Sequence, residues 1–196
     1  YVNNELVYKS HLYNYYDFDD VIDNAIEYYE CYEKLNKKIL LNFSIGKIKE
    51  KWMREGIEEY SKRLKPVAKV DVLESDEEKM PENPSAAVKG KVLEKEGEKL
   101  LRSIQDSGCV VLLDMNGKKV SSEELAAWIA QKTIMGTSHF YFIIGGPYGN
   151  GKNIQARADL KLSMGPMTFT HQMARLILFE QLYRAVKINH HEPYHL

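Results

Sequence analysis

From residue 39 onward, hydrophobic and polar residues follow two repeating patterns that together predict an α/β fold. Short apolar runs typical of buried strands occupy 39–45, 67–73, 109–113, 139–144 and 161–164. Apolar residues recur at helical spacing over 49–64, in a charged segment that ends near Ile104, in a run after Ser121, and over 171–188. Strands that alternate with helices favour a parallel or mixed sheet covered by helices.

Local signals set several boundaries of these elements. Pro66 ends the first of the helical segments because proline cannot continue a helix. Ser121 and Glu124 stand three residues apart before a helical run, which is the signature of a capping box. Asn116-Gly117 predicts a turn that closes the strand beginning at Cys109.

Residues 1–38 differ in composition from the rest of the chain. They contain eight of the 13 tyrosines and no glycine or proline. Apolar residues at helical spacing after Asp17 and Asp19 predict one amphipathic helix. We therefore treat 1–38 as an N-terminal helical extension that packs on a neighbour or partner, and 39–196 as the main domain. A chain that begins at Lys38 is expected to fold and dimerise.

Composition excludes some classes of protein. The chain has 196 residues, 44% hydrophobic residues and a formal charge of −1, so it can bury a sizeable core. The acidic extension leaves residues 39–196 mildly basic, which is compatible with an RNA partner. Cys31 and Cys109 suggest neither a disulfide framework nor a metal site, so a reducing cytoplasm is expected. No apolar run is long enough to span a membrane, and no signal peptide is visible.

Two glycine-marked turns carry the candidate chemistry. One reads Phe-Ile-Ile-Gly-Gly-Pro-Tyr-Gly over 142–149, and the other reads Leu-Ser-Met-Gly-Pro-Met-Thr-Phe over 162–169. Each turn follows an apolar run, and loops at neighbouring strand ends can form one cleft with exposed backbone donors. Such a cleft suits a nucleotide-like small molecule.

A phosphate-binding loop is the competing interpretation of the first turn. Gly146 to Asn153 nearly matches G-x-x-x-x-G-K-[ST], but Asn153 stands where a hydroxyl should coordinate Mg²⁺. Pro147 also removes a backbone N–H from a loop that should offer such groups to phosphates. Nucleotide hydrolysis is therefore the weaker alternative.

A series of short motifs in fixed order resembles the SPOUT-class methyltransferases, and within them the ribosomal RNA large subunit methyltransferase H family. The resemblance extends from residue 39 to the end of the chain. The matching stretches are Ser44–Lys47, Glu94–Gly97, Leu113–Lys118, Ile144–Pro147, Leu162–Ser163, Met167–Gln172, Glu180–Ala185 and Glu192–His195.

The resemblance implies an α/β fold whose C-terminal part forms a deep trefoil knot. Family members are homodimers that bind S-adenosylmethionine, need no metal, and methylate N3 of a pseudouridine in large-subunit (23S) ribosomal RNA on the assembled ribosome. Carried over by position, the cofactor contacts fall on Leu113, Gly145, Gly146, Met164, Gly165, Pro166, Met167, Thr168 and Phe169. The alternatives are that the glycines only end a strand and that Met167 and Phe169 are plain core residues.

The methyl acceptor must lose an imide proton, so a base or hydrogen-bonding group is expected nearby. His171, Tyr194 and His195 are the candidates, with Arg175 to hold the RNA or stabilise a developing anion. Each also has a structural interpretation: His171 as the start of a helix, Arg175 as a surface charge, and the tail as a disordered end. A knotted protein that binds the ribosome without turnover remains a further alternative.

Overall fold

The structure is a computed structural model that describes residues 38–45, 47–75 and 78–194, with only the backbone described for 38–45. These residues belong to one compact unit. The predicted helical extension therefore lies outside the described residues, and the boundary at residue 38 stays a prediction.

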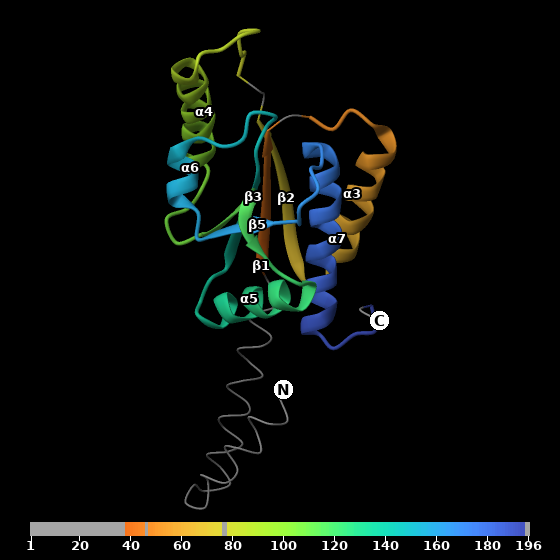
Figure 1. The fold of residues 1–196 in the computed structure, drawn as a ribbon. Helices are drawn as coiled ribbons and strands as arrows, with labels where there is room; N and C mark the ends of the chain where they lie inside the picture. The colour runs from red at the N-terminus through yellow and green to blue at the C-terminus, as the bar shows by residue number, and fades with distance from the viewer. Residues whose placement is uncertain (1–37, 46, 76–77, 195–196) are drawn as a thin grey trace, which may run out of the picture. The chain divides into compact units, whose positions relative to one another are not determined.

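Five parallel strands form a single sheet with the order β2-β1-β4-β3-β5. The elements along the chain are β1 (Lys38–Ile45), α3 (Lys51–Leu64), β2 (Ala68–Ser75), α4 (Ala86–Leu101), β3 (Cys109–Lys119), α5 (Ser122–Ile134), β4 (His139–Ile144), α6 (Lys152–Arg157), β5 (Leu160–Ser163) and α7 (His171–Asn189). The predicted α/β class with a parallel sheet is confirmed. Figure 1 shows α4 and α6 on one side of the sheet and α3 and α7 on the other.

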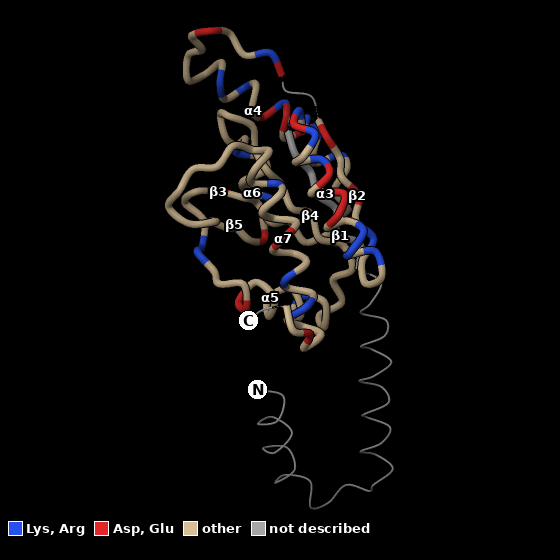
Figure 2. The backbone as a smooth tube through the Cα atoms, turned by 90° about the vertical axis from the view of Figure 1, so that its right-hand side faces the viewer, with Lys and Arg blue, Asp and Glu red and all other residues tan. Residues whose placement is uncertain are grey.

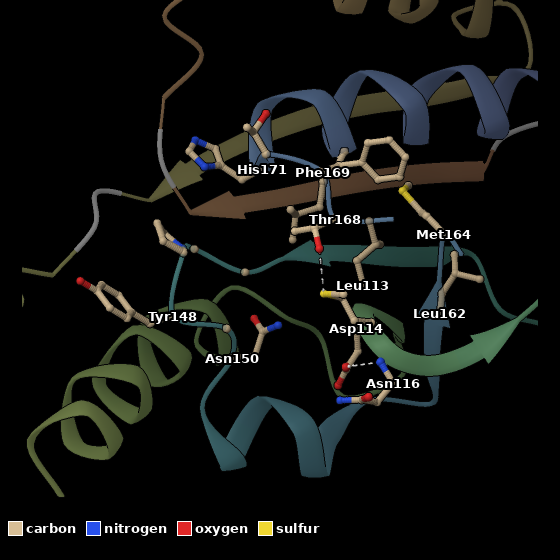
Figure 3. A pocket seen from close by; sticks show the side chains of 18 of the residues that line it. Leu113, Asp114, Asn116, Tyr148, Asn150, Leu162, Met164, Thr168, Phe169 and His171 are labelled. Carbon is tan, nitrogen blue, oxygen red and sulfur yellow. Dashed lines mark hydrogen bonds between the residues drawn. The ribbon is translucent and has the colours of Figure 1, made fainter. Parts of the chain in front are cut away.

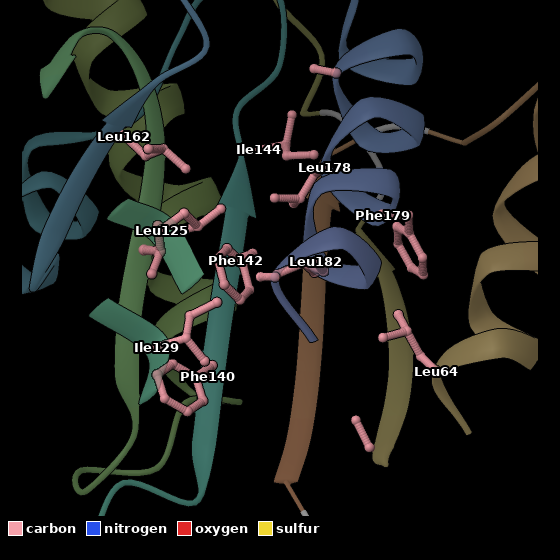
Figure 4. Packing of buried hydrophobic residues seen from close by; sticks show 14 of the residues in the cluster. Leu64, Leu125, Ile129, Phe140, Phe142, Ile144, Leu162, Leu178, Phe179 and Leu182 are labelled. Atoms are coloured by element: carbon pink, nitrogen blue, oxygen red, sulfur yellow. The ribbon is translucent and has the colours of Figure 1, made fainter. Parts of the chain in front are cut away.

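The two faces of the sheet are buried by alternating residues of the central strands, because successive strand side chains point to opposite faces. On β4, Phe140 and Phe142 belong to the core shared with α3, α5 and α7, whereas Tyr141 and Ile143 belong to the core shared with α4 and α6. Figure 4 shows Phe142 facing Leu182 of α7 in the larger core. Full burial of a side chain of this size contributes about 1.5–3 kcal/mol.

Charged residues of both signs follow α3 and β2 (Figure 2). Because β2 is an edge strand, these charges face solvent and oppose pairing with other strands. Among the described residues, no helix is both long and apolar enough to cross a bilayer.

Two features differ from the sequence-based expectations, and one local signal is confirmed. β3 does not close at Asn116-Gly117 but continues to Lys119, because Lys118 and Lys119 pair with β5. The short helix α6 was not expected, since its six residues are too few for a periodic pattern. The capping box of α5 is confirmed in both directions, with Glu124 N–H donating to Ser121 and Ser121 N–H donating to Glu124.

Candidate functional site

A pocket of roughly 750 Å³ lies where three neighbouring strands end. Its walls come from the end of β3 and the loops that follow β4 and β5, which are adjacent in the sheet. The carboxyl ends of parallel strands meet at one edge, and this is where α/β sheets commonly bind ligands. Figure 3 shows side chains of the three segments around the pocket.

The part of the pocket wall that comes from β3 is shaped by an irregular pairing of β3 with β5. Leu162 is in register with Leu113 and also with Lys118, so β5 contacts residues on both sides of the bend at 114–117. A Cβ on Gly117 would lie 2.6 Å from the carbonyl carbon and oxygen of Lys161. Glycine is required here because two backbone segments approach more closely than a side chain allows.

The loop after β4 is a tight turn. Gly149 N–H donates to Gly146 C=O at 3.0 Å, and Gly149 has a φ of +89° that favours glycine. The Asn150 side chain folds back so that a Cβ on Gly145 would lie 2.7 Å from both its amide atoms. At Gly145 the pocket wall is therefore formed by backbone atoms, and the side-chain amide of Asn150 lies against them.

The loop after β5 is tied to the end of β3 through a buried hydroxyl. Ser163 Oγ donates to Met115 C=O at 3.2 Å and accepts from Gly165 N–H at 3.3 Å. Gly165 has a φ of +109° with open space around it, so this glycine serves backbone conformation rather than close approach. Thr170 Oγ1 accepts from Met173 N–H at 3.3 Å and caps α7.

The pocket lining is poor in charge. Among the described residues that line it, the titratable side chains are those of Asp114, Tyr148 and His171, and there is no lysine or arginine. The other polar lining groups are amides, hydroxyls and backbone atoms. A ligand with several negative charges would find no cation here, whereas a neutral or cationic ligand would not be opposed.

The structure brings together nearly all of the predicted cofactor residues. The lining includes Leu113, Gly145, Gly146, Met164, Gly165, Met167, Thr168 and Phe169. Pro166 belongs to the same loop, but it is exposed and does not line the pocket. Met167 is 68% exposed, so the alternative that it is a core residue does not fit this structure.

Of the predicted catalytic residues, His171 lines the pocket at the first turn of α7 and Arg175 does not. Arg175 is fully buried, and its Nη1 lies 2.5 Å from Glu74 Oε1 at the end of β2. The expected contact of Arg175 with RNA therefore needs correction. Because a buried charge is costly unless paired, this arginine holds α7 against β2.

Tyr194 lies beyond the other end of α7, and His195 is outside the described residues. The Tyr194 ring packs on Tyr183 at 4.8 Å and lies 4.9 Å from the Arg184 guanidinium carbon. A hydrogen bond with Tyr60, followed by burial, raises the pKa of Tyr194 to about 12. In this position Tyr194 is neutral at physiological pH and cannot serve as a base.

Sequence reasoning missed several lining residues, among them Asp114, Asn150 and Gln155. Gln155 Nε2 donates to Asn150 C=O at 2.8 Å and so supports the loop after β4 from within α6. Asp114 stood inside a motif that carried the resemblance. Its position directly after the apolar core of β3 was the available signal, because polar residues at strand ends commonly face ligands.

The phosphate-loop interpretation does not fit the geometry. Asn153 Nδ2 donates to Glu94 C=O at 2.8 Å, so the side chain at the expected Mg²⁺ position is engaged by α4. A Cβ on Gly151 would lie 2.5 Å from Leu93 C=O, which leaves no room for a phosphate beside it. Within the described part of the chain, no group of three or more His, Cys, Asp or Glu side chains could hold a metal ion.

Comparison with known proteins identifies the family. Residues 38–195 match the family described as "Predicted SPOUT methyltransferase". Since this match covers most of the chain, the chain belongs to the SPOUT methyltransferase family.

Curated relatives are similar over nearly their whole length. "Ribosomal RNA large subunit methyltransferase H" of Carboxydothermus hydrogenoformans is 52% identical over 152 residues, which are 78% of this chain and 96% of the relative. The protein with the same name in Bifidobacterium animalis subsp. lactis is 49% identical over 77% of this chain and 95% of its own length. In Methanococcus maripaludis, a "Putative ribosomal RNA large subunit methyltransferase H" is 48% identical over 78% of this chain and 96% of its own.

A solved structure is also similar: "The structure of a probable methylase family protein from Haemophilus influenzae Rd KW20". It is 11% identical and covers 82% of this chain and 70% of its own chain with a TM-score of 0.44.

Proposed function

We propose that the protein is an S-adenosylmethionine-dependent methyltransferase that modifies N3 of a pseudouridine in large-subunit ribosomal RNA. Membership of the SPOUT family supports the methyltransferase class. Relatives that are 52% and 49% identical in sequence are named as ribosomal RNA large subunit methyltransferases, and these names support ribosomal RNA as the substrate. A ribosomal substrate would place the reaction in the cytoplasm.

The observation that carries this proposal is the character of the pocket. An adenosyl group needs an apolar slot with backbone hydrogen bonds, and Leu113, Met164 and Phe169 with the flat backbone at Gly145 supply one. The lack of lysine or arginine in the described part of the lining suits a ligand without phosphates. The residues present therefore fit S-adenosylmethionine better than a nucleoside triphosphate.

A C-terminal trefoil knot is part of the proposal. It is supported by the irregular pairing of β5 with β3, in which Leu162 is in register with both Leu113 and Lys118. The contact of Gly117 with the Lys161 backbone supports the same threading. Knots are rare among proteins, so local sequence patterns could not have suggested this one.

The protein must align the methyl donor with the acceptor nitrogen and remove one proton from that nitrogen. When bound, S-adenosylmethionine supplies an electrophilic methyl group, and the carbon–sulfur bonding pair stays on sulfur. The residues around the pocket hold the two reactants in line, which can be worth about 7 kcal/mol or more. His171, at the pocket wall, would accept the imide proton of N3 as the nitrogen lone pair forms the new bond.

The positions of His171 and Tyr194 favour a homodimer. They lie at opposite ends of α7, whose 19 residues span about 28 Å. One chain therefore cannot bring the tail and the pocket together in this arrangement. A two-fold dimer with antiparallel α7 helices would place Tyr194 and His195 of one copy beside the pocket of the other.

A mixed-dimer experiment tests this arrangement. One partner carries His171→Ala with an intact tail, and the other has an intact pocket but ends at Pro193. If the site is shared between copies, mixing the two inactive variants restores methylation because one pocket of each mixed dimer is complete. If each chain uses its own tail, the mixture stays inactive.

The function itself is tested with labelled S-adenosylmethionine and ribosomes that lack the modification. Mass spectrometry of the RNA should show one added methyl group on one pseudouridine. Cofactor binding with no transfer would favour the alternative of a ribosome-binding protein without turnover.

A further inference from the structure

Of the described residues that line the pocket, Asp114 is the one with an acidic side chain. It comes directly after the apolar part of β3, and it is half-buried. Because no lysine or arginine occurs among the described lining residues, none of them is a cation that could neutralise this carboxylate. A single carboxylate in a pocket otherwise built from amides, hydroxyls and apolar groups gives the site a negative potential.

The carboxylate is held in place by its own turn. Asp114 Oδ1 accepts from Asn116 N–H at 2.9 Å, as the dashed line in Figure 3 shows. The turn cannot shift toward β5, because Gly117 already lies against the Lys161 backbone. The negative charge is therefore preorganised rather than recruited by a ligand.

We propose that Asp114 makes the pocket sensitive to the ligand's positive charge, so that it favours the methyl donor over the demethylated product. This inference rests on the proposed function. S-adenosylmethionine carries a sulfonium, an ammonium and a carboxylate, whereas S-adenosylhomocysteine has lost the sulfonium charge. The two ligands otherwise have the same hydrogen-bonding groups, so any contact to the adenosine or the amino acid part favours both equally.

A charge effect of this kind acts through space and does not require direct contact. In a partly buried pocket, a carboxylate several ångströms from a cation changes affinity by about tenfold. The preference would help product release, because the attraction between Asp114 and the sulfonium is lost once the methyl group has moved. It would also resist product inhibition.

Two other roles for Asp114 predict different behaviour. If its only role is the turn with Asn116, replacing it with an amide that can still accept the Asn116 N–H changes little. If it hydrogen-bonds the ribose, its loss weakens donor and product equally. Only a charge effect changes the ratio of the two affinities.

The test is calorimetry of both ligands with Asp114→Asn, Asp114→Glu and the unmodified protein. We expect Asp114→Asn to weaken S-adenosylmethionine binding about tenfold and S-adenosylhomocysteine binding less than threefold. Asp114→Glu keeps the charge and should keep the ratio even if both affinities fall. The matched control is Asp106→Asn, which removes an exposed carboxylate just before β3. This residue lies near the amino-terminal ends of the strands, whereas the pocket lies at their carboxyl ends. The control variant should leave both affinities unchanged.

Kinetics gives a second measurement. Asp114→Asn should raise KM for S-adenosylmethionine with little loss of kcat, because the interaction belongs to the bound donor and weakens in the transition state. Inhibition by S-adenosylhomocysteine should become stronger relative to that KM.

An unchanged affinity ratio in Asp114→Asn, whether both ligands weaken or neither does, would overturn the inference while leaving the proposed function intact. Absence of binding of either ligand to the unmodified protein would overturn the proposed function instead.

Discussion

The two ends of α7 are built in different ways. At its N-terminal end, around His171, the pocket is shaped by backbone turns, glycines and one capping hydroxyl. At its C-terminal end, side chains make the contacts: Arg184 pairs with Glu180, and its guanidinium lies over the Tyr194 ring. The first end presents a surface on which a ligand can lie, and the second holds the chain's own tail.

This contrast suggests that the two ends of α7 serve different functions. At the pocket end, backbone contacts fix the loops and leave space for a ligand. Substitutions there should change cofactor binding or the stability of the fold. The tail end is fixed by exchangeable side-chain contacts, and substitutions there should act on RNA methylation. Each prediction below tests one side of this contrast.

Gly117→Ala should have the largest effect. Its Cβ would lie 2.6 Å from the Lys161 backbone, which cannot move without breaking the pairing of β5. We expect a loss of about 3 kcal/mol or more in the free energy of unfolding, measured by chemical denaturation. The control is Gly90→Ala on α4, where nothing lies within 4 Å, and which should be neutral or stabilising by up to about 1 kcal/mol. Equal stability of the two variants would contradict the close approach of β3 and β5.

Removal of Tyr194 to Leu196 should act on catalysis and not on the pocket. We expect methylation of ribosomes to fall about 100-fold, because the shortened chain loses His195, a candidate base, and Tyr194, a hydrogen-bonding group, while S-adenosylmethionine affinity stays the same. Turnover assays and calorimetry on the same preparation measure the two effects. Full activity without the tail would rule out its role in the reaction.

Glu74→Gln should weaken the fold near the pocket end by removing a partner of a buried guanidinium. Because Glu74 is one-third exposed, we expect about 1–3 kcal/mol, less than for a wholly buried pair. Glu82→Gln, an exposed acid, is the matched control and should cost less than about 0.5 kcal/mol. A similarly small cost for Glu74→Gln would mean that the ion pair does not hold α7 against β2.

Gly165→Val and Gly145→Val should weaken S-adenosylmethionine binding for different reasons. Valine at 165 must adopt a φ of +109°, which costs about 1–2 kcal/mol of strain and would reduce affinity roughly tenfold if the loop relaxes. Valine at 145 collides with the Asn150 side chain, which can turn away, so its effect should be smaller. Unchanged affinity in both variants would place the ligand elsewhere.

Tyr194→Phe should have the smallest effect, visible only at high pH. The hydrogen bond with Tyr60 raises the pKa of Tyr194 from 10.0 to about 12, so it favours the neutral phenol in the folded protein. Its contribution to stability is complete below pH 10 and is lost as the pH rises toward 12. Denaturation midpoints across this range should fall less steeply in Tyr194→Phe than in the unmodified protein. Parallel curves would show that the phenol does not titrate in this way.

Much of the fold could be predicted from local patterns. Periodicity placed the strands β1, β2, β4 and β5 and the helices α3 and α7 to within a few residues, because each buries one regular set of apolar side chains. The extension of β3 to Lys119 could not be predicted, since it depends on pairing with β5, more than forty residues later. Short-range periodicity carries no information about such a partner.

The residues of the site were predicted less accurately than the strands and helices of the fold. The glycine turns marked the pocket because their backbone requirements are visible in the sequence, although Gly165 proved to serve conformation and Gly145 to make room for Asn150. Arg175 was misread because its partner, Glu74, is 101 residues away, and a buried ion pair looks the same in sequence as an exposed charge. Asp114 was not named as a cofactor residue, because one acid directly after an apolar strand is a weak signal without a distinctive spacing.

The most direct test of the central claim is a calorimetric titration of the unmodified protein with S-adenosylmethionine and, separately, with ATP and Mg²⁺. A pocket for a methyl donor at the ends of β4, β3 and β5 predicts one S-adenosylmethionine bound per chain and no heat from ATP. Binding of Mg²⁺-ATP, with no response to S-adenosylmethionine, would contradict the account.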